Sequence, residues 1–357
     1  MASTKRPQGT SRPGGASRGP GQSASTGGGP RRLGGQQPPP RRQGGAQRRY
    51  ERARQKSTFG KRFGWIAVGV VLAVVIALVV VKLTSGGSSA NSGTSAADRN
   101  PVAAPAAEVN ALTTIPASVF NTVGVAGQPA AFAVTANQPR LTLGGKPRFV
   151  YEGAEYCPYC AVTRYSIVAA LSRFGTFSGL KKTSSGPNDL NIPTFSFLGS
   201  HYTSKYVAFT PYEAADRLQK PLQKVPADVN SLYLKYDGDP TTGQPSKFAS
   251  GMWQSPGIPF LDIANKYVVA GSSPGLYGVV SSGVLQNGGP GRLAIANAIH
   301  SPDSPTGKAI QASQFIVEAN YLAAAICDVD GHAPASVCAS PGVTAAAKTL
   351  ATVKPVG

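Results

Sequence analysis

The feature that most constrains this chain is an unbroken apolar run, FGWIAVGVVLAVVIALVVV, from Phe63 to Val81. As a helix, these 19 residues would extend about 28 Å, close to the hydrocarbon thickness of a bilayer. The run has no polar face that would suit a helix on a soluble core. A cleaved signal peptide fits poorly, because a long arm precedes the run and no small-residue cleavage site closes it. We therefore predict one transmembrane helix, residues 63–83.

The arm that precedes this run, residues 1–62, is rich in Gly, Pro, Gln, Ser and Arg. It carries 15 Lys or Arg and a single acid, Glu51, and so contributes most of the net charge of +19. Such a composition cannot bury a core, so we expect a disordered arm. The positive-inside rule places the arm in the cytoplasm, next to anionic lipids. Because no folded reading element accompanies the charges, we expect no specific nucleic-acid partner.

The residues after the span divide into a linker and a folded domain. Residues 84–109 are mostly small or polar and predict a flexible linker. From residue 110 to residue 357, apolar runs, aromatic residues and scattered charges indicate one substantial domain. By the orientation above, this domain is extracytoplasmic, and the protein is a single-pass protein of the cell membrane.

Two cysteines of this domain, Cys157 and Cys160, form a CPYC motif between a strand-like sequence and a helix-like sequence. PRFVYEG, residues 147–153, predicts a strand, and the apolar spacing of CAVTRYSIVAALSRFG predicts a helix. Pro158 suits the first turn of that helix, because its missing N–H group costs nothing there. Cys157 would then lie at a helix N-terminus, where free N–H groups and the helix dipole stabilise a thiolate.

Three roles are open for this cysteine pair: redox chemistry, a static disulfide or zinc binding. Zinc would need two further ligands, and none of the three histidines forms a paired spacing with the cysteines. These histidines are His201, His300 and His332. We favour redox chemistry and expect neither a metal nor a cofactor. Arg164, one turn beyond Cys160, is expected to be a solvated helix charge.

The arrangement of a strand, CxxC and a helix resembles the active site of the thioredoxin superfamily, and CPYC is the form found in glutaredoxins. Three stretches, EGAEYCPYCAVTRYSIVAALSRFGTFSGL, GIPFLDIANKYVVAGS and NYLAAAICDVDGHAPASVC, resemble domain-of-unknown-function family 929. That family consists of membrane-anchored thioredoxin-like proteins. The resemblance covers most of residues 110–340 and implies an α/β thioredoxin-like fold with a C-terminal helical extension.

A thioredoxin-like fold implies further site residues. A cis-proline should face the cysteines from the start of a later strand, and Pro259 in GIPFLDIANKYVVAG is our prediction, with Pro193 as the alternative. The long stretch between the cysteines and Pro259 implies a large insertion, which we place within residues 200–255. A buried acid often accepts the proton of the second thiol. Glu152 and Glu155 are the local candidates, although a surface position is the ordinary one for each.

The other two cysteines, Cys327 and Cys338, are 11 positions apart. Cys327 ends an amphipathic helical pattern, SQFIVEANYLAAAIC, and the chain then returns to Cys338. In an oxidising compartment this pair predicts a structural disulfide that closes a short loop. A relay that exchanges with Cys157 is the alternative.

These features together predict a membrane-anchored thiol–disulfide oxidoreductase that acts on extracytoplasmic protein thiols or disulfides. Cys157 would attack, and Cys160 would resolve the mixed disulfide. A single span without a flavin or quinone motif implies a separate redox partner. The alternative function is a non-enzymatic membrane-tethered binding or envelope-assembly domain in which both cysteine pairs form structural disulfides. Oxidases, isomerases and reductases share this motif, so the direction of electron transfer stays open.

Overall fold

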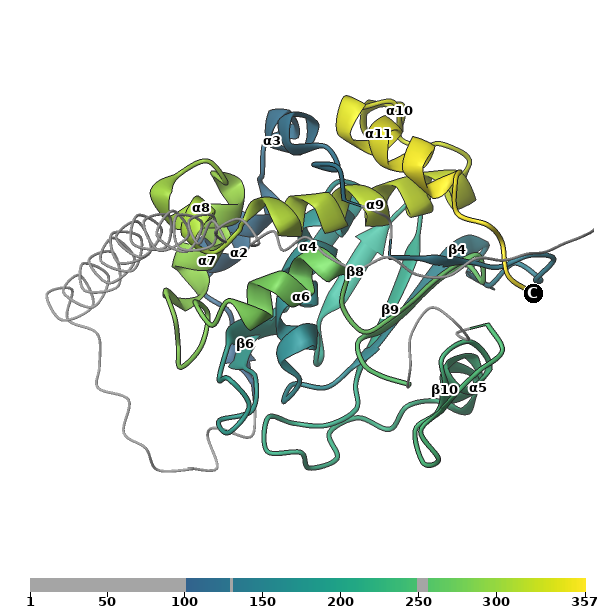
Figure 1. The fold of residues 1–357 in the computed structure, drawn as a ribbon, viewed down its shortest axis with the longest axis horizontal. Coiled ribbons are helices and arrows are strands. Elements are labelled where there is room, and N and C mark those ends of the chain that lie inside the picture. Colours follow the sequence, from purple (N-terminus) through teal and green to yellow (C-terminus); the bar gives the residue numbers. More distant parts are fainter. Residues whose placement is uncertain (1–100, 129–130, 249–255) are drawn as a thin grey trace, which may run out of the picture. The chain divides into compact units, whose positions relative to one another are not determined.

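The computed structural model describes residues 101–128, 131–248 and 256–357. The predicted basic arm (1–62) and transmembrane helix (63–83) lie outside this part of the chain. Among the described residues, no helix is both long enough and apolar enough to cross a membrane. The described residues form a mixed α/β structure, which confirms the expected fold class at that level (Figure 1).

The strands in chain order are β1 (Val102–Ala103), β2 (Ala133–Val134), β3 (Thr142–Leu143), β4 (Lys146–Gly153), β5 (Gly175–Ser178), β6 (Lys181–Ser184), β7 (Pro193–Ser196), β8 (His201–Ser204), β9 (Ala208–Glu213), β10 (Gly238–Asp239), β11 (Gln244–Pro245), β12 (Phe260–Ile263) and β13 (Tyr267–Ala270). The helices are α2 (Ala106–Thr113), α3 (Ala117–Val123), α4 (Pro158–Leu171), α5 (Ala227–Tyr236), α6 (Pro274–Ser281), α7 (Gly291–His300), α8 (Pro305–Ala309), α9 (Ser313–Asp330), α10 (Ala335–Cys338) and α11 (Pro341–Leu350).

The main sheet has six strands in the order β2-β13-β12-β4-β3, and β9 also pairs with β4. β4 and β9 are parallel, in a register that pairs Arg148 with Ala208 and Gly153 with Glu213. β12 is antiparallel to both β4 and β13. Two smaller groups, β1-β6-β7 and β5-β8, combine the segment between α4 and β9 with β1 from the start of the described region. The carboxyl end of β4 therefore lies between β12 and β9 and leads directly to the CPYC motif.

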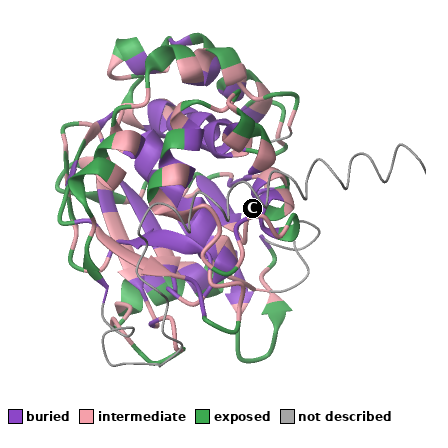
Figure 2. Ribbon diagram, turned by 90° about the vertical axis from the view of Figure 1, so that its left-hand side faces the viewer, coloured by how far each residue is buried: buried purple, intermediate pink, exposed green. Residues whose placement is uncertain are grey.

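Helix α4 is the central helix of this structure. Every residue of α4 except Tyr159 is buried. Figure 2 shows buried residues, in purple, in the strands of the sheet and in the helices that cover it. Tyr165 of α4 makes edge contacts with Phe195 of β7 and with Phe315 of α9, at ring-centroid distances of 5.4 and 5.7 Å. Since α4 packs against neighbours on all sides, its sequence needs no polar face, and Arg164 is its only charged residue.

A separate apolar cluster contains residues of β12 and β13 and residues of the segment between β9 and β12. Phe260 of β12 makes an edge contact with Tyr233 of α5 at 5.4 Å between ring centroids. The other buried members are Ala133, Tyr236, Phe248 and Val268. α5 and Phe248 therefore pack against residues of the sheet that do not belong to the cluster around α4.

The folded region begins earlier than the composition indicates. Val102 and Ala103 pair with Lys182 and Lys181 of β6, and α2 begins at Ala106. Residues 101–109, the last part of the predicted linker (84–109), therefore belong to the folded structure. Their Ala- and Pro-rich sequence resembles a tether, but α2 is held by long-range packing against α7 and α4, which local composition does not reveal.

Candidate functional site

The CPYC motif lies where β4 ends and α4 begins, as its sequence pattern predicts. Cys157 is the N-cap residue of α4, and Pro158 occupies the first helical position. Gly153, the last residue of β4, leaves room for the ring of Tyr151, because a Cβ atom at position 153 would lie 2.2 Å from the Tyr151 hydroxyl oxygen. Glycine at position 153 therefore lets the chain pass close to the buried Tyr151 ring between the end of β4 and the start of α4.

The two thiols have different environments. Both cysteines are buried, but Cys160 has no exposed surface, whereas 5% of the Cys157 residue is exposed. The backbone N–H of Cys160 donates a hydrogen bond to the Cys157 Sγ atom at 3.2 Å. Both cysteines are free thiols in this structure.

These environments move the two thiol pKa values in opposite directions. A hydrogen bond from the Cys160 side chain lowers the pKa of Cys157, and burial of Cys157 opposes this shift. The backbone N–H of Cys160 and the positive charge of Arg164 lower the pKa of Cys157 further. Burial raises the pKa of Cys160 well above its ordinary value. The arrangement provides one activated thiol and one protonated thiol, which is the division of roles that a nucleophile and a resolving cysteine need.

Of the two candidate prolines, the structure brings Pro259 to the cysteines. The Ile258–Pro259 peptide bond is cis, and the Cys157 Sγ atom lies 3.5 Å from the Ile258 carbonyl oxygen, to which the thiol can donate. Pro193 begins β7, where its carbonyl accepts a hydrogen bond from the Tyr165 hydroxyl at 2.8 Å. Pro193 therefore helps to anchor α4, while Pro259 borders the reactive sulfur.

The prediction that Arg164 is a solvated helix charge is wrong. Its side chain has 0% exposure, as has that of its ion-pair partner Glu213 at the end of β9. The guanidinium donates to both carboxylate oxygens of Glu213, at 2.9 and 2.6 Å, and to the Ala154 carbonyl at 2.8 Å. A buried charge needs such a partner, because desolvation is otherwise too costly. The sequence holds one clue to it, since Arg164 is the only charge in a helix that has no polar face.

Glu155 and Glu152 occupy unlike sites, and neither forms a hydrogen bond with a cysteine sulfur in the described part of the chain. Glu155 is fully buried and accepts hydrogen bonds from the hydroxyls of Ser196 and Thr183 at 2.6 and 3.2 Å. Glu152 is half-buried, and its Oε2 atom has no hydrogen-bond partner. Burial, together with the nearby charge of Asp237, raises the pKa of Glu152 to about 7.

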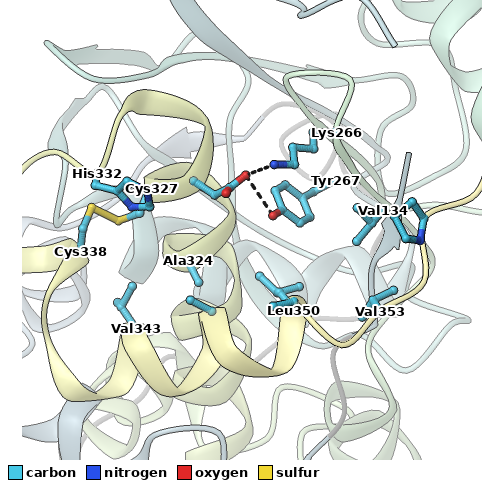
Figure 3. Close-up of a pocket in the computed structure, with 14 residues that line it drawn as sticks. Val134, Lys266, Tyr267, Ala324, Cys327, His332, Cys338, Val343, Leu350 and Val353 are labelled. Atoms are coloured by element: carbon cyan, nitrogen blue, oxygen red, sulfur yellow. Dashed lines mark hydrogen bonds and ion pairs between the residues drawn. A yellow bond between two sulfur atoms is a disulfide. The ribbon is translucent and has the colours of Figure 1, made fainter. Parts of the chain in front are cut away.

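The second cysteine pair forms a disulfide, as the sequence predicts. Cys327, near the end of α9, is joined to Cys338 of α10 with a Cα–Cα distance of 5.6 Å. The disulfide borders a pocket of about 340 Å³ whose apolar wall includes Val343 and Leu350 of α11 (Figure 3). On another wall of this pocket, the Asp328 carboxylate accepts hydrogen bonds from Lys266 and Tyr267.

The three histidines lie apart from the CPYC motif. His201 belongs to β8, His300 ends α7, and the exposed His332 lies beside the Cys327–Cys338 disulfide (Figure 3). Within residues 101–128, 131–248 and 256–357, no group of three or more His, Cys, Asp or Glu side chains is arranged to hold a metal ion.

The sequence model of one protein family, described as "Domain of unknown function (DUF929)", matches residues 132–327, more than half of the chain. The chain belongs to the DUF929 family. The DUF929 region includes the CPYC motif, Arg164, Glu213 and Pro259, and ends at Cys327, so α10, α11 and Cys338 follow it. No curated protein and no solved structure matches the chain.

Proposed function

We propose that this chain is a thiol–disulfide oxidoreductase with a thioredoxin-like domain. The order β9-β4-β12-β13, with a parallel β4–β9 pair and an antiparallel β12–β13 hairpin, supports this fold. The cysteine-bearing helix α4 follows β4, and the cis-proline directly precedes β12. In this proposal, the segment between β9 and β12, which carries α5, is the large insertion, and α10 and α11 are the C-terminal extension.

The observation that carries the proposal is the position of Cys157. Its sulfur caps α4, accepts the N–H of Cys160 and lies against the carbonyl that precedes Pro259. A thiolate at a helix N-terminus is stabilised by the N–H groups and by the helix dipole, so it is a nucleophile at neutral pH.

In the proposed reaction, the Cys157 thiolate attacks one sulfur of a substrate disulfide. The substrate S–S bond breaks, a mixed disulfide with Cys157 forms, and one substrate thiolate leaves. Cys160 then loses its proton and attacks the Cys157 sulfur. This second exchange releases the other substrate thiolate and leaves a Cys157–Cys160 disulfide, so two electrons have passed to the substrate. The same steps in reverse oxidise a substrate dithiol, and an external dithiol or disulfide partner restores the starting state.

Cys160 needs a proton acceptor in this reaction, because its burial favours the protonated thiol. Neither predicted acid contacts the Cys160 sulfur. Tyr151 and Glu152 are adjacent in β4 and point to opposite faces of the sheet: Tyr151 faces the cysteines, and Glu152 faces Asp237. We therefore assign the acceptor role to the substrate thiolate that leaves in the first exchange. Both oxygens of Glu155 already accept hydrogen bonds from hydroxyl groups, so we assign Glu155 to the support of the site.

We further propose that the domain acts outside the cytoplasm, anchored by residues 63–83, with the basic arm on the cytoplasmic side near anionic lipids. The Cys327–Cys338 disulfide supports this location, because structural disulfides persist mainly in oxidising compartments. The substrates would then be protein thiols or disulfides of that compartment.

The test of this proposal is a trapping experiment with Cys160→Ser in the full-length protein. Without the resolving thiol, Cys157 should remain covalently joined to its substrates in cells. The adducts should survive non-reducing electrophoresis, dissolve with reductant, and be missing in a Cys157→Ser/Cys160→Ser control. The proposal fails if nothing is trapped and Cys157 of the purified protein is alkylated no faster than an ordinary cysteine at pH 7. A tethered binding domain would then describe the chain better.

A further inference from the structure

A pair of stacked tyrosine rings lies at the cysteine motif. Tyr159, inside CPYC, stacks on Tyr277 of α6 with 5.4 Å between ring centroids and 10° between ring planes. Tyr277 is 55% exposed, although it is a large aromatic residue, while Tyr159 is half-buried. The pair therefore presents aromatic surface to solvent next to the nucleophile.

The stack is held by contacts between α4 and the loop that precedes α6. The Ser272 hydroxyl lies 3.4 Å from the Tyr159 carbonyl oxygen, to which it donates, and 3.2 Å from the Thr163 hydroxyl. These contacts join the first turns of α4 to the start of α6. A surface that is already ordered loses little conformational entropy when a partner binds, which favours recognition at this place.

The surroundings of the stack add a third tyrosine. Tyr156 directly precedes Cys157 and is half-buried. Burial raises the pKa of both Tyr156 and Tyr159, and the neighbouring Asp189 acts in the same direction. Both phenols therefore stay neutral at physiological pH, and this rim of the site offers aromatic faces with hydrogen-bonding tips.

We propose that the Tyr159–Tyr277 stack binds polypeptide substrates that carry an aromatic residue next to the reacting cysteine. The inference rests on the proposed redox function and adds a substrate preference to it. Adjacent Cα atoms are only about 3.8 Å apart, so the neighbours of an attacked cysteine must lie over the residues that flank Cys157. Aromatic side chains bury a large area with few rotatable bonds, and aromatic pairs add stabilisation beyond that area. A small thiol compound has no neighbouring residue that could use this surface.

The test compares two peptide disulfides that differ only in having Phe or Ser before the cysteine. The second-order rate constant for their reduction by pre-reduced full-length protein is measured for the wild type and for Tyr277→Ala. We expect Tyr277→Ala to slow the Phe peptide about threefold to tenfold and to leave the Ser peptide unchanged. Tyr277→Phe should retain the preference. Leu143→Ala is the matched control, because Leu143 is 49% exposed but precedes β4, at the far end of that strand from Cys157.

The outcomes separate this inference from the function on which it rests. Equal rates for the two peptides in the wild type, with normal reduction of hydroxyethyl disulfide, would overturn the substrate preference and leave the redox function standing. An equal loss for both peptides and hydroxyethyl disulfide in Tyr277→Ala would show that the stack acts on Cys157 and not on the substrate. A wild type that reduces none of the three compounds would overturn both proposals.

Discussion

Replacement of Arg164 by Met should destabilise the protein strongly and also reduce the reactivity of its thiols. Arg164 supplies three hydrogen bonds within the core, two to Glu213 and one to the Ala154 carbonyl. Methionine is apolar and of similar reach, so it removes the charge without leaving a large cavity. The carboxylate of Glu213 would then remain in the core without its counter-charge.

The size of the effect follows from the burial of the pair. Both side chains have 0% exposure, and loss of one partner of a buried ion pair costs about 3–5 kcal/mol, against about 0.2–1 kcal/mol for an exposed pair. For a domain of this size, that cost lowers the melting temperature by about 6–20 °C. The same substitution should raise the pKa of Cys157, because the positive charge of Arg164 is one of the influences that lower it.

Two measurements on the full-length protein test these expectations. Urea unfolding gives the free energy of unfolding, and the pH dependence of iodoacetamide alkylation gives the Cys157 pKa. Arg164→Lys is the control, since it keeps the charge but loses the planar fork. It should destabilise the fold while it leaves the Cys157 pKa close to that of the wild type. Arg164→Met combined with Glu213→Met should recover much of the lost stability, because an apolar pair of similar volume can replace a buried ion pair.

The result that refutes this reasoning is specific. If Arg164→Met costs less than about 1 kcal/mol, the pair behaves as an exposed ion pair and is not buried as described. If stability falls but the Cys157 pKa is unchanged, Arg164 supports the fold and does not tune the thiol.

Three further predictions concern other parts of the chain. Cys327→Ser opens a disulfide between residues 11 positions apart, which should cost about 2–3 kcal/mol in thermal or urea unfolding but preserve thiol exchange; loss of exchange at unchanged stability would favour the relay instead. Burial raises the pKa of Glu318 from 4.5 to about 7, so the stability that its protonated form contributes is lost as the pH rises through 7. Glu318→Gln should therefore stabilise the protein at pH 8 by up to about 3 kcal/mol and change little at pH 5. Equal changes at both pH values would contradict the burial argument. Protease added to intact cells should remove the domain after residue 84 and spare residues 1–62, and protection of the domain would reverse the topology.

Local sequence was sufficient to predict the elements around the cysteines. The strand predicted for residues 147–153 corresponds to β4, and the predicted helix after Cys157 corresponds to α4. Pro158 at the first helical position marks that boundary, because its fixed φ and missing N–H suit this position. Pro259 was also predicted to lie at the start of a strand, and β12 begins at Phe260. Each of these features depends on neighbours within a few residues.

The tertiary structure decided which residues surround the reactive sulfur. Ile258 lies 101 positions from Cys157 along the chain, and Glu213 lies 49 positions from Arg164. The local sequence of α4 does not identify Ile258 or Glu213 as a partner. The single charge in an otherwise uncharged helix indicates only that Arg164 has a counter-charge elsewhere in the fold. The physical reason is that α4 is buried on every side by elements from distant parts of the chain. A charge in such a helix must find its counter-charge in the fold, and only the packing of β9 against β4 brings Glu213 to it.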